Sequence, residues 1–500
     1  MYRHSSDGIP PAILTIPGAI AHHARLRSDD PALISERRVL TWRGLHDVTH
    51  VLATSLRALG VTPRDRVAFH CSTPVIFDDL ITIFGMMSAC AVVMIDSALP
   101  LAGRQRLIER ATPLAIVSPE DLDATGLPSP VWPVAAGNRI TSAAPIPGRT
   151  PAPECGPTPG AIAAVLTSSG STAEPKLIPV RHETLIIGAQ IDADTLALTP
   201  ADRMLHLFPP QFGLFGMAFM ATCTGGSTLV ADGRPGMSDL ALANLLAPTW
   251  TCATPVNLAR IADHLAATIP GPSTTFRAIL TGGAPASPRI RQRITSGFRA
   301  PLFDFYGATE AYSLASGGRI TGEIRIADDG NNPLPPGREG EIQARGPLVF
   351  SGYLDDPDLT AAVFTPDGWF RTGDIGRIDP DDRLAVLGRR VEQINRGGLK
   401  ISPLEIESAI LAHPAVAEAL VCAIPHASLG QDVAMAVVPH AGETVSRREL
   451  RRWLLERLQA GKVPRTILTL DALPVTGTGK ASRRALAALI ETRSAAGDDE

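Results

Sequence analysis

The stretch Leu166-Thr-Ser-Ser-Gly-Ser-Thr-Ala-Glu-Pro-Lys176 decides how the rest of this 500-residue chain is interpreted. Its first residue, Leu166, ends the apolar run Ala161–Leu166, which predicts a strand. The residues that follow predict a loop rich in hydrogen-bond donors. Glycine and short hydroxyl side chains allow backbone N–H groups and Oγ atoms to converge on phosphate oxygens, and Lys176 adds a positive charge. The stretch predicts a polyphosphate-binding loop, although a Ser/Thr-rich surface linker has a similar composition.

The same stretch differs from the phosphate loop of nucleoside triphosphatases. That motif needs a glycine immediately before the lysine and a serine or threonine after it to hold magnesium. Here Pro175 precedes Lys176 and Leu177 follows it. A different class of nucleotide site is therefore indicated.

The bulk composition narrows the possible partners. With 46 basic and 50 acidic side chains, the formal net charge of −4 gives no long-range attraction for nucleic acid or an anionic membrane. The six cysteines are scattered without a Cys-x-x-Cys pair, so neither a zinc site nor a disulfide framework is indicated. No apolar run approaches the roughly 20 residues needed to span a bilayer. We expect a protein of the reducing cytoplasm without a nucleic-acid or membrane partner.

The first third of the chain has the pattern of an α/β protein. The stretches Arg64–His70, Ile76–Met87 and Ala91–Ile95 predict a strand, a helix and a strand, which form the crossover unit of a parallel sheet. Arg104–Arg110 and Leu114–Val117 predict a further helix and strand. A connector rich in proline, glycine and alanine, residues 135–160, then leads to the predicted phosphate loop.

Four further motifs follow in order. Ala278–Pro285 predicts a strand and a glycine turn that allows a flat base to approach the backbone. Asp304-Phe-Tyr-Gly-Ala-Thr-Glu310, Gly368-Trp-Phe-Arg-Thr-Gly-Asp-Ile-Gly376 and Pro474-Val-Thr-Gly-Thr-Gly-Lys-Ala-Ser-Arg-Arg484 are the other three. Together with the phosphate loop, they resemble the adenylate-forming superfamily of acyl- and aryl-CoA ligases, adenylation domains and beetle luciferases.

The resemblance implies two groups of nucleotide-binding residues. In the phosphate loop they are Thr167, Ser168, Ser169, Gly170, Ser171, Thr172 and Lys176. The family has glycine where this chain has Ala173 and Leu177, and neither change removes a donor or the lysine. Around the adenine the implied residues are Gly282, Gly283, Ala284, Pro285, Asp304, Tyr306 and Gly307, with Tyr306 stacked on the base.

The resemblance also implies the catalytic groups. Thr309 is expected to reach the α-phosphate, Glu310 to hold Mg²⁺, and Lys480 to stabilise charge on the carboxylate and α-phosphate as they react. Asp374 is expected to accept hydrogen bonds from the ribose hydroxyls. Arg389 is expected to contact ribose or phosphate.

The implied acyl pocket lies in the segment Phe208–Met217. Here Gly213 stands where the family usually has a gating histidine, and Phe212 and Met217 are the other pocket residues that we single out. A buried helix beside the sheet is an equally good interpretation of these apolar residues.

Acidic residues are absent from this segment. Amino-acid-activating relatives use an aspartate there to pair with the α-ammonium group, because a buried unpaired cation is costly. No acidic residue lies between Asp202 and Asp232. An uncharged or carboxylate-only acyl group is favoured over an α-amino acid.

Two domains are predicted. Residues 1–388 form a large domain with mixed sheets flanked by helices, which binds ATP and the acid, and residues 389–500 form a small mobile α+β domain. The segment Val391–Glu407, which contains Gly398, resembles the part of the small domain that lines the thiol tunnel after rotation. Val391 stands where the family has a pivot aspartate or lysine.

The predicted activity is ATP-dependent conversion of a carboxylic acid to an acyl-adenylate, followed by transfer to a thiol. Coenzyme A is the favoured acceptor, and the phosphopantetheine arm of a carrier protein is the alternative. A non-catalytic nucleotide-binding protein of the same fold is the alternative from another class.

Overall fold

The computed structural model describes residues 10, 12–71, 77–96, 99–119, 126–135, 139–168, 176–206, 219–230, 246–268, 275–284, 286, 288–474 and 481–496. The chain divides into two compact units, which we treat separately. The first comprises Met1–Pro285, Arg293–Ile324 and Ala344–Phe370, and the second comprises Ala286–Gln292, Arg325–Gln343 and Arg371–Glu500. The predicted boundary at residues 388 and 389 stays a prediction.

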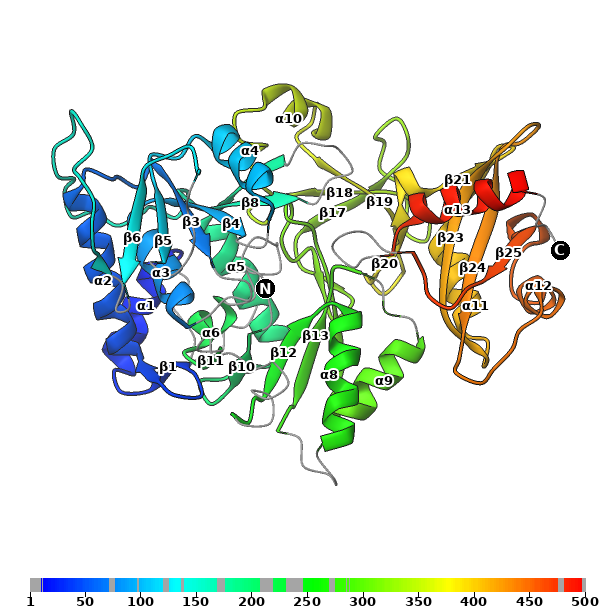
Figure 1. Ribbon diagram of the computed structural model, residues 1–500, viewed down its shortest axis with the longest axis horizontal. Coiled ribbons are helices and arrows are strands. Elements are labelled where there is room, and N and C mark those ends of the chain that lie inside the picture. The colour runs from blue at the N-terminus through cyan, green and yellow to red at the C-terminus, as the bar shows by residue number, and fades with distance from the viewer. Residues whose placement is uncertain are drawn as a thin grey trace. The chain divides into compact units, whose positions relative to one another are not determined.

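The first unit contains a seven-stranded sheet in the order β7-β6-β5-β3-β4-β8-β9 (Figure 1). Its strands are β3 Arg66–Cys71, β4 Ala91–Asp96, β5 Ile116–Pro119, β6 Val131–Ala135, β7 Arg139–Ile140, β8 Ile162–Ser168 and β9 Lys176–Arg181. The helices α3 Phe77–Met87 and α4 Leu101–Ala111 join consecutive parallel strands, from β3 to β4 and from β4 to β5. The predicted crossover units are therefore confirmed.

A second sheet of the first unit has nine strands in the order β16-β15-β14-β13-β12-β10-β11-β1-β2. Its strands are β1 Pro31–Ile34, β2 Val39–Thr41, β10 Arg203–Leu205, β11 Ser227–Leu229, β12 Trp250–Ala253, β13 Ala278–Thr281, β14 Leu302–Tyr306, β15 Ala315–Ser316 and β16 Arg319–Ile320. Strands β10, β12, β13 and β14 pair in parallel, so their carboxyl ends share one edge. The mixed sheets expected of the large domain are present.

Helices cover these sheets because their apolar residues recur on one face. In α2 (Trp42–Ala58), Leu45, Leu52 and Leu56 are buried, and the Thr41 hydroxyl caps the helix by accepting from Gly44 N–H. This helix packs against α1 (Ile16–Leu26) and α3. The described residues of the first unit also contain the helices α5 His182–Thr195, α6 Phe219–Thr224, α8 Pro255–Thr268 and α10 Pro357–Val363, and α9 Pro288–Phe298 runs from the second unit into the first.

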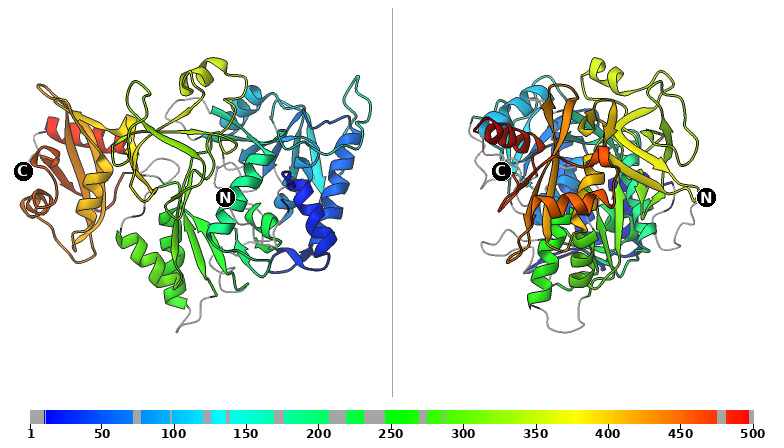
Figure 2. Two further views of the ribbon diagram at one scale, coloured as in Figure 1. Left: turned by 180° about the vertical axis from the view of Figure 1, so that it is seen from behind. Right: turned by 90° about the vertical axis from the view of Figure 1, so that its right-hand side faces the viewer.

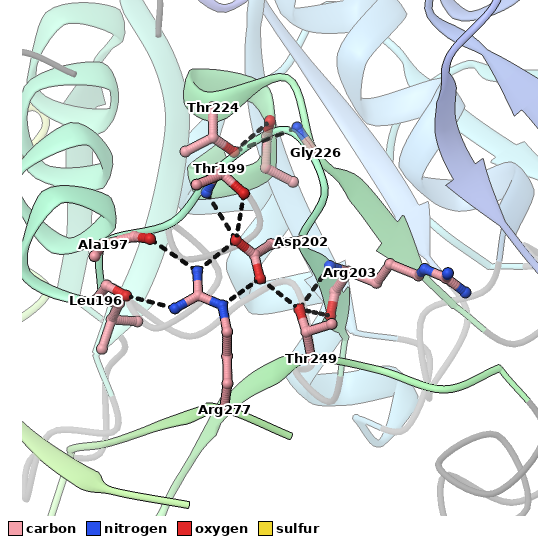
Figure 3. Close-up of polar contacts among 10 residues, drawn as sticks. Leu196, Ala197, Thr199, Asp202, Arg203, Thr224, Gly226, Thr249 and Arg277 are labelled. Atoms are coloured by element: carbon pink, nitrogen blue, oxygen red, sulfur yellow. Dashed lines mark hydrogen bonds and ion pairs between the residues drawn. The ribbon is translucent and has the colours of Figure 1, made fainter. Parts of the chain in front are cut away.

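An ion pair between a buried aspartate and a partly exposed arginine fastens the amino ends of the parallel strands (Figure 3). Asp202, Thr249 and Arg277 directly precede β10, β12 and β13. Arg277 forms an ion pair with Asp202 and also donates to the carbonyls of Leu196 at 3.1 Å and Ala197 at 2.8 Å. The pair therefore ties the turn after α5 to this edge of the sheet.

Two further sheets contribute to the second unit. Most residues of the four-stranded sheet β17-β18-β19-β20 belong to it: β17 Glu323–Ala327, β18 Gly340–Arg345, β19 Phe370–Ile378 and β20 Leu384–Arg389. The five-stranded sheet contains β21 Ile394–Arg396, β22 Leu399–Ile401, β23 Val416–His426, β24 Gly430–Pro439 and β25 Thr466–Thr469. Its helices are α11 Pro403–Leu411, α12 Arg447–Leu455 and α13 Arg483–Ala496, with short 3₁₀ turns at Arg390–Glu392 and Ala460–Lys462.

Alternation along β23 builds two cores in the second unit. Val421 packs with Ile406 of α11 and Leu450 of α12, whereas Leu420 and its neighbours on the other face pack with Leu486 of α13. Successive side chains of a strand point to opposite faces, so the helices lie on the two sides of this sheet (Figure 2). The predicted α+β class of the C-terminal part is confirmed. In the part of the chain that the structure describes, none of the helices is both long and apolar enough to cross a bilayer.

Candidate active site

The predicted phosphate loop connects two strands of a hairpin. β8 and β9 are antiparallel, with Ser168 opposite Lys176 and Thr167 opposite Leu177. Thr167, Ser168 and Lys176 therefore lie together at the base of the hairpin. The connecting residues, which include Ser169, Gly170, Ser171 and Thr172, lie outside the described residues.

The two predicted adenine-binding segments leave the same edge of the nine-stranded sheet. β13 pairs in parallel with β14, with Thr281 opposite Asp304. Gly282 therefore follows the last residue of β13, and Tyr306 is the last residue of the neighbouring strand β14. A Cβ at Gly282 would lie 2.8 Å from Cδ1 of Phe305, which explains why glycine is needed there. Gly283 has a φ of +75°, and Ala284 beside it is exposed. The carboxyl edge of an open α/β sheet is where ligands commonly bind.

The loop that bears Thr309 and Glu310 is held by its backbone. Ala308 and Ala311 exchange backbone hydrogen bonds, and Phe350 N–H donates to the carbonyl of Glu310 at 2.8 Å. A Cβ at Gly307 would lie 2.9 Å from both Ala311 O and Ser313 N, so this tight turn requires glycine. The loop presents its side chains from a fixed backbone.

Tyr353 connects this loop with the base of the hairpin. Its hydroxyl donates to Glu310 Oε1 at 3.0 Å, and Lys176 Nζ lies 5.1 Å from the centre of its ring. The sequence analysis assigned Tyr353 no role. The residues are far apart in the chain, so only the tertiary structure reveals the contact.

A buried carboxyl supports the segment after Glu310. Asp192 of α5 is fully buried and accepts a hydrogen bond from the Ser313 hydroxyl at 2.8 Å. Burial raises the pKa of Asp192 to about 7, and the Ser313 hydrogen bond opposes this change only in part. Tyr312, which precedes Ser313, packs against Gly188 of the same helix, where a Cβ would lie 2.0 Å from the Tyr312 ring.

The second unit carries another pair of predicted residues. Asp374 of β19 lies opposite Arg389 of β20, and Arg389 Nε is 2.9 Å from Asp374 Oδ1. The Asp374 side chain is 9% exposed, whereas that of Arg389 is 55% exposed. Gly398, with a φ of +92°, occupies the turn between β21 and β22 and donates its N–H to Asn395 Oδ1 at 3.0 Å. The structure therefore pairs Asp374 with Arg389 and places Gly398 in a separate hairpin.

The remaining predicted site residues lie outside the described residues. They are Pro285 of the adenine segment, Phe212, Gly213 and Met217 of the acyl segment, and Lys480. Among the described residues, no group of three or more His, Cys, Asp or Glu side chains has the arrangement of a metal site.

Family models match most of the chain. The model described as AMP-binding enzyme matches residues 20–354, and that of the AMP-binding enzyme C-terminal domain matches residues 405–480. The chain belongs to the AMP-binding enzyme family. The resemblance inferred from the motifs is confirmed.

Named relatives of this AMP-binding enzyme include an oxalate–CoA ligase of Saccharomyces cerevisiae, 33% identical over 344 residues that cover 65% of this chain and 63% of the relative. The matched regions span 45% to 66% of the first four curated relatives' own length. ATP-bound MatB of Rhodopseudomonas palustris is similar in structure, with a TM-score of 0.80, 25% identity and coverage of 96% of this chain and 99% of MatB. O-succinylbenzoate CoA synthetase of Bacillus subtilis, solved with its acyl-adenylate intermediate, has a TM-score of 0.77, 26% identity and coverage of 94% and 97%.

Proposed function

We propose that this enzyme activates a carboxylic acid with ATP as an acyl-adenylate and transfers the acyl group to coenzyme A. The observation that carries the proposal is the cluster at the sheet edge, where Tyr353 contacts both Lys176 and Glu310. A lysine and a carboxylate held together in this way suit a triphosphate and its cation. The names of the oxalate–CoA ligase and of the O-succinylbenzoate CoA synthetase agree with the proposal.

The first step needs alignment and charge neutralisation more than covalent help. A carboxylate oxygen attacks the α-phosphorus of ATP, and pyrophosphate leaves. We assign the phosphates to Lys176 and the hydroxyls of the hairpin loop, the adenine to Tyr306, and the α-phosphate to Thr309. Lys480 stabilises the charge that develops on the reacting carboxylate and α-phosphate.

Mg²⁺ fits Glu310. One carboxylate oxygen accepts from Tyr353, and no basic side chain in the described part of the chain pairs with this residue. Mg²⁺ commonly takes one or two protein carboxylates and completes its shell with phosphate oxygens and water, so a three-carboxylate cluster is not needed. When bound, it would neutralise charge on the phosphates.

The second step transfers the acyl group to a thiol. The thiol sulfur attacks the acyl carbon of the adenylate, and AMP leaves. We assign ribose binding to the Asp374 carboxylate, a hydrogen-bond acceptor, and ribose or phosphate binding to its ion-pair partner Arg389. Rotation of residues 389–500 would exchange Lys480 for the segment that contains Gly398.

Substrate, acceptor and compartment belong to the same proposal. The acyl segment with Phe212, Gly213 and Met217 has no acidic residue, which favours an acid without an α-ammonium group. The thiol of a carrier protein is the alternative acceptor. None of the six cysteines, all of which lie within the described residues, forms a disulfide, which is compatible with a reducing cytoplasm.

The test measures carboxylate-dependent pyrophosphate release with short-chain, dicarboxylic, fatty, aryl and amino acids, with and without CoA. We expect release with one class of acid and faster turnover with CoA. Release that CoA does not affect would indicate a carrier protein. ATP binding without release for any acid would support the non-catalytic alternative.

A variant separates the two steps. Lys480→Ala should abolish adenylation while acyl transfer from supplied acyl-AMP is largely retained. An equal loss in both half-reactions would contradict the exchange of Lys480 between two conformations.

A further inference from the structure

One short segment of the first unit is hydrogen bonded to both halves of the proposed phosphate site. Leu354 N–H donates to the carbonyl of Leu177, which follows Lys176, at 2.9 Å. At the other end, Phe350 N–H donates to the carbonyl of Glu310 at 2.8 Å. The segment 350–354 therefore fixes the separation between the hairpin base and the Glu310 loop.

Tyr353 lies at the centre of this segment and is held on several sides. The residue is 7% exposed, its ring packs edge-on against Phe350 at 5.0 Å between centres, and its N–H donates to Thr360 Oγ1 at 2.9 Å. The preceding Gly352 has a φ of +133°, and a Cβ there would lie 2.5 Å from Thr360. A ring held in this way can orient the group that its hydroxyl contacts.

Two different contacts extend from this one side chain. The hydroxyl donates to Glu310 Oε1 at 3.0 Å, while the ring face lies under Lys176 Nζ at 5.1 Å. A hydrogen bond to an ionised carboxylate is stronger than one between neutral groups, and an ammonium over an aromatic face is attracted to it. This hydrogen bond fixes the orientation of the carboxylate, and Oε2 keeps both of its lone pairs for a cation.

We propose that Tyr353 is a positioning residue for nucleotide binding. Its hydroxyl orients the Glu310 carboxylate toward a divalent cation, and its ring holds the Lys176 ammonium over the ring face. This inference rests on the proposed function. Its hydroxyl acts through Glu310 and its ring acts through Lys176, so the two effects are separable by substitution.

The experiment measures the Kd of ATP by titration calorimetry with excess Mg²⁺ and with EDTA, without any acid substrate. Tyr353→Phe removes the donor and keeps the ring, so the enhancement of ATP affinity by Mg²⁺ should fall about tenfold, the scale of one charged hydrogen bond. The Kd in EDTA should stay unchanged. Tyr353→Leu also removes the ring and should weaken binding in EDTA about two- to fivefold.

Matched controls distinguish positioning from a general structural effect. Tyr312→Phe removes a hydroxyl from the other buried tyrosine near this loop and should leave the Mg²⁺ enhancement unchanged. In a Glu310→Gln background, Tyr353→Phe should cause no further loss of the enhancement, because its hydroxyl acts through the carboxylate. Circular dichroism and thermal unfolding verify that each variant is folded.

The outcomes separate this inference from the proposed function. If the wild type binds ATP with a clear Mg²⁺ enhancement that Tyr353→Phe leaves intact, the positioning role is refuted and the proposed function stands. An additive loss in the Glu310→Gln background would also refute it. If the wild type does not bind ATP, the proposed function itself fails.

Discussion

Arg277 provides a quantitative test of how the amino ends of the parallel strands are held (Figure 3). Its ion-pair partner Asp202 has a side chain that is 5% exposed, while that of Arg277 is 40% exposed. Arg277→Met would keep much of the aliphatic stem and remove every guanidinium donor. The buried carboxylate would then lose the positive charge that offsets its desolvation.

The magnitude follows from the donors that remain. Removing one partner of a fully buried pair costs about 3–5 kcal/mol, and the exposure of Arg277 reduces this figure. Asp202 also keeps Thr199 N–H at 2.7 Å, Thr199 Oγ1 at 3.0 Å and Thr249 Oγ1 at 2.8 Å. We expect the free energy of unfolding to fall by about 2–3 kcal/mol.

Urea unfolding at pH 7 measures this change. Trp250 follows Thr249 directly in β12 and is 1% exposed, so its fluorescence reports on unfolding near the ion pair. Combining Arg277→Met with Asp202→Asn in a double-mutant cycle should give a coupling of about 2 kcal/mol. Arg293→Met is the matched control, because Arg293 and Asp263 form an ion pair with side chains that are 52% and 48% exposed, and should cost less than about 1 kcal/mol.

The pH dependence gives a second check. Burial opposes ionisation of Asp202, but hydrogen bonds from Arg277, Thr199 and Thr249 outweigh it and hold its pKa below the ordinary value. The contribution is therefore fully present above about pH 4 and is lost as the pH falls through the folded-state pKa. Equal losses for Arg277→Met and Arg293→Met, or a coupling near zero, would refute the reasoning.

Three further predictions concern the supports of the site. Because burial raises the pKa of Asp192 to about 7, its contribution to stability should decline by up to about 4 kcal/mol as the pH rises from about 4 to 7. Asp192→Asn should flatten the pH dependence of the free energy of unfolding in urea, and an unchanged pH dependence would contradict the raised pKa. Gly307→Ala should lower carboxylate-dependent pyrophosphate release at least tenfold, since its Cβ would lie 2.9 Å from Ala311 O, whereas near-normal rates would show that the turn tolerates a side chain. Gly188→Ala should lower the thermal unfolding midpoint by several degrees, because its Cβ would lie 2.0 Å from the Tyr312 ring, and a midpoint equal to that of wild type would show that the ring can move.

The family, the fold class and the order of the motifs were predictable from the amino-acid sequence. Local patterns are sufficient for this because they depend on residues close in the chain: the apolar run before Thr167 predicted β8, and the run Ala278–Thr281 predicted β13. The same patterns predicted the crossover units around α3 and α4. The roles of Lys480 and of the acyl segment stay predictions.

Contacts between residues far apart in the chain depend on how the elements pack in three dimensions. The Tyr353 hydroxyl reaches Glu310 because the chain returns along the loop and pairs Ala311 with Val349, and no local pattern specifies that pairing. Asp374 meets Arg389 because the strands β19 and β20 pair in one particular register. Hydrophobic periodicity indicates which face of an element is buried, whereas contacts between side chains depend on the packing and register of elements far apart in the sequence.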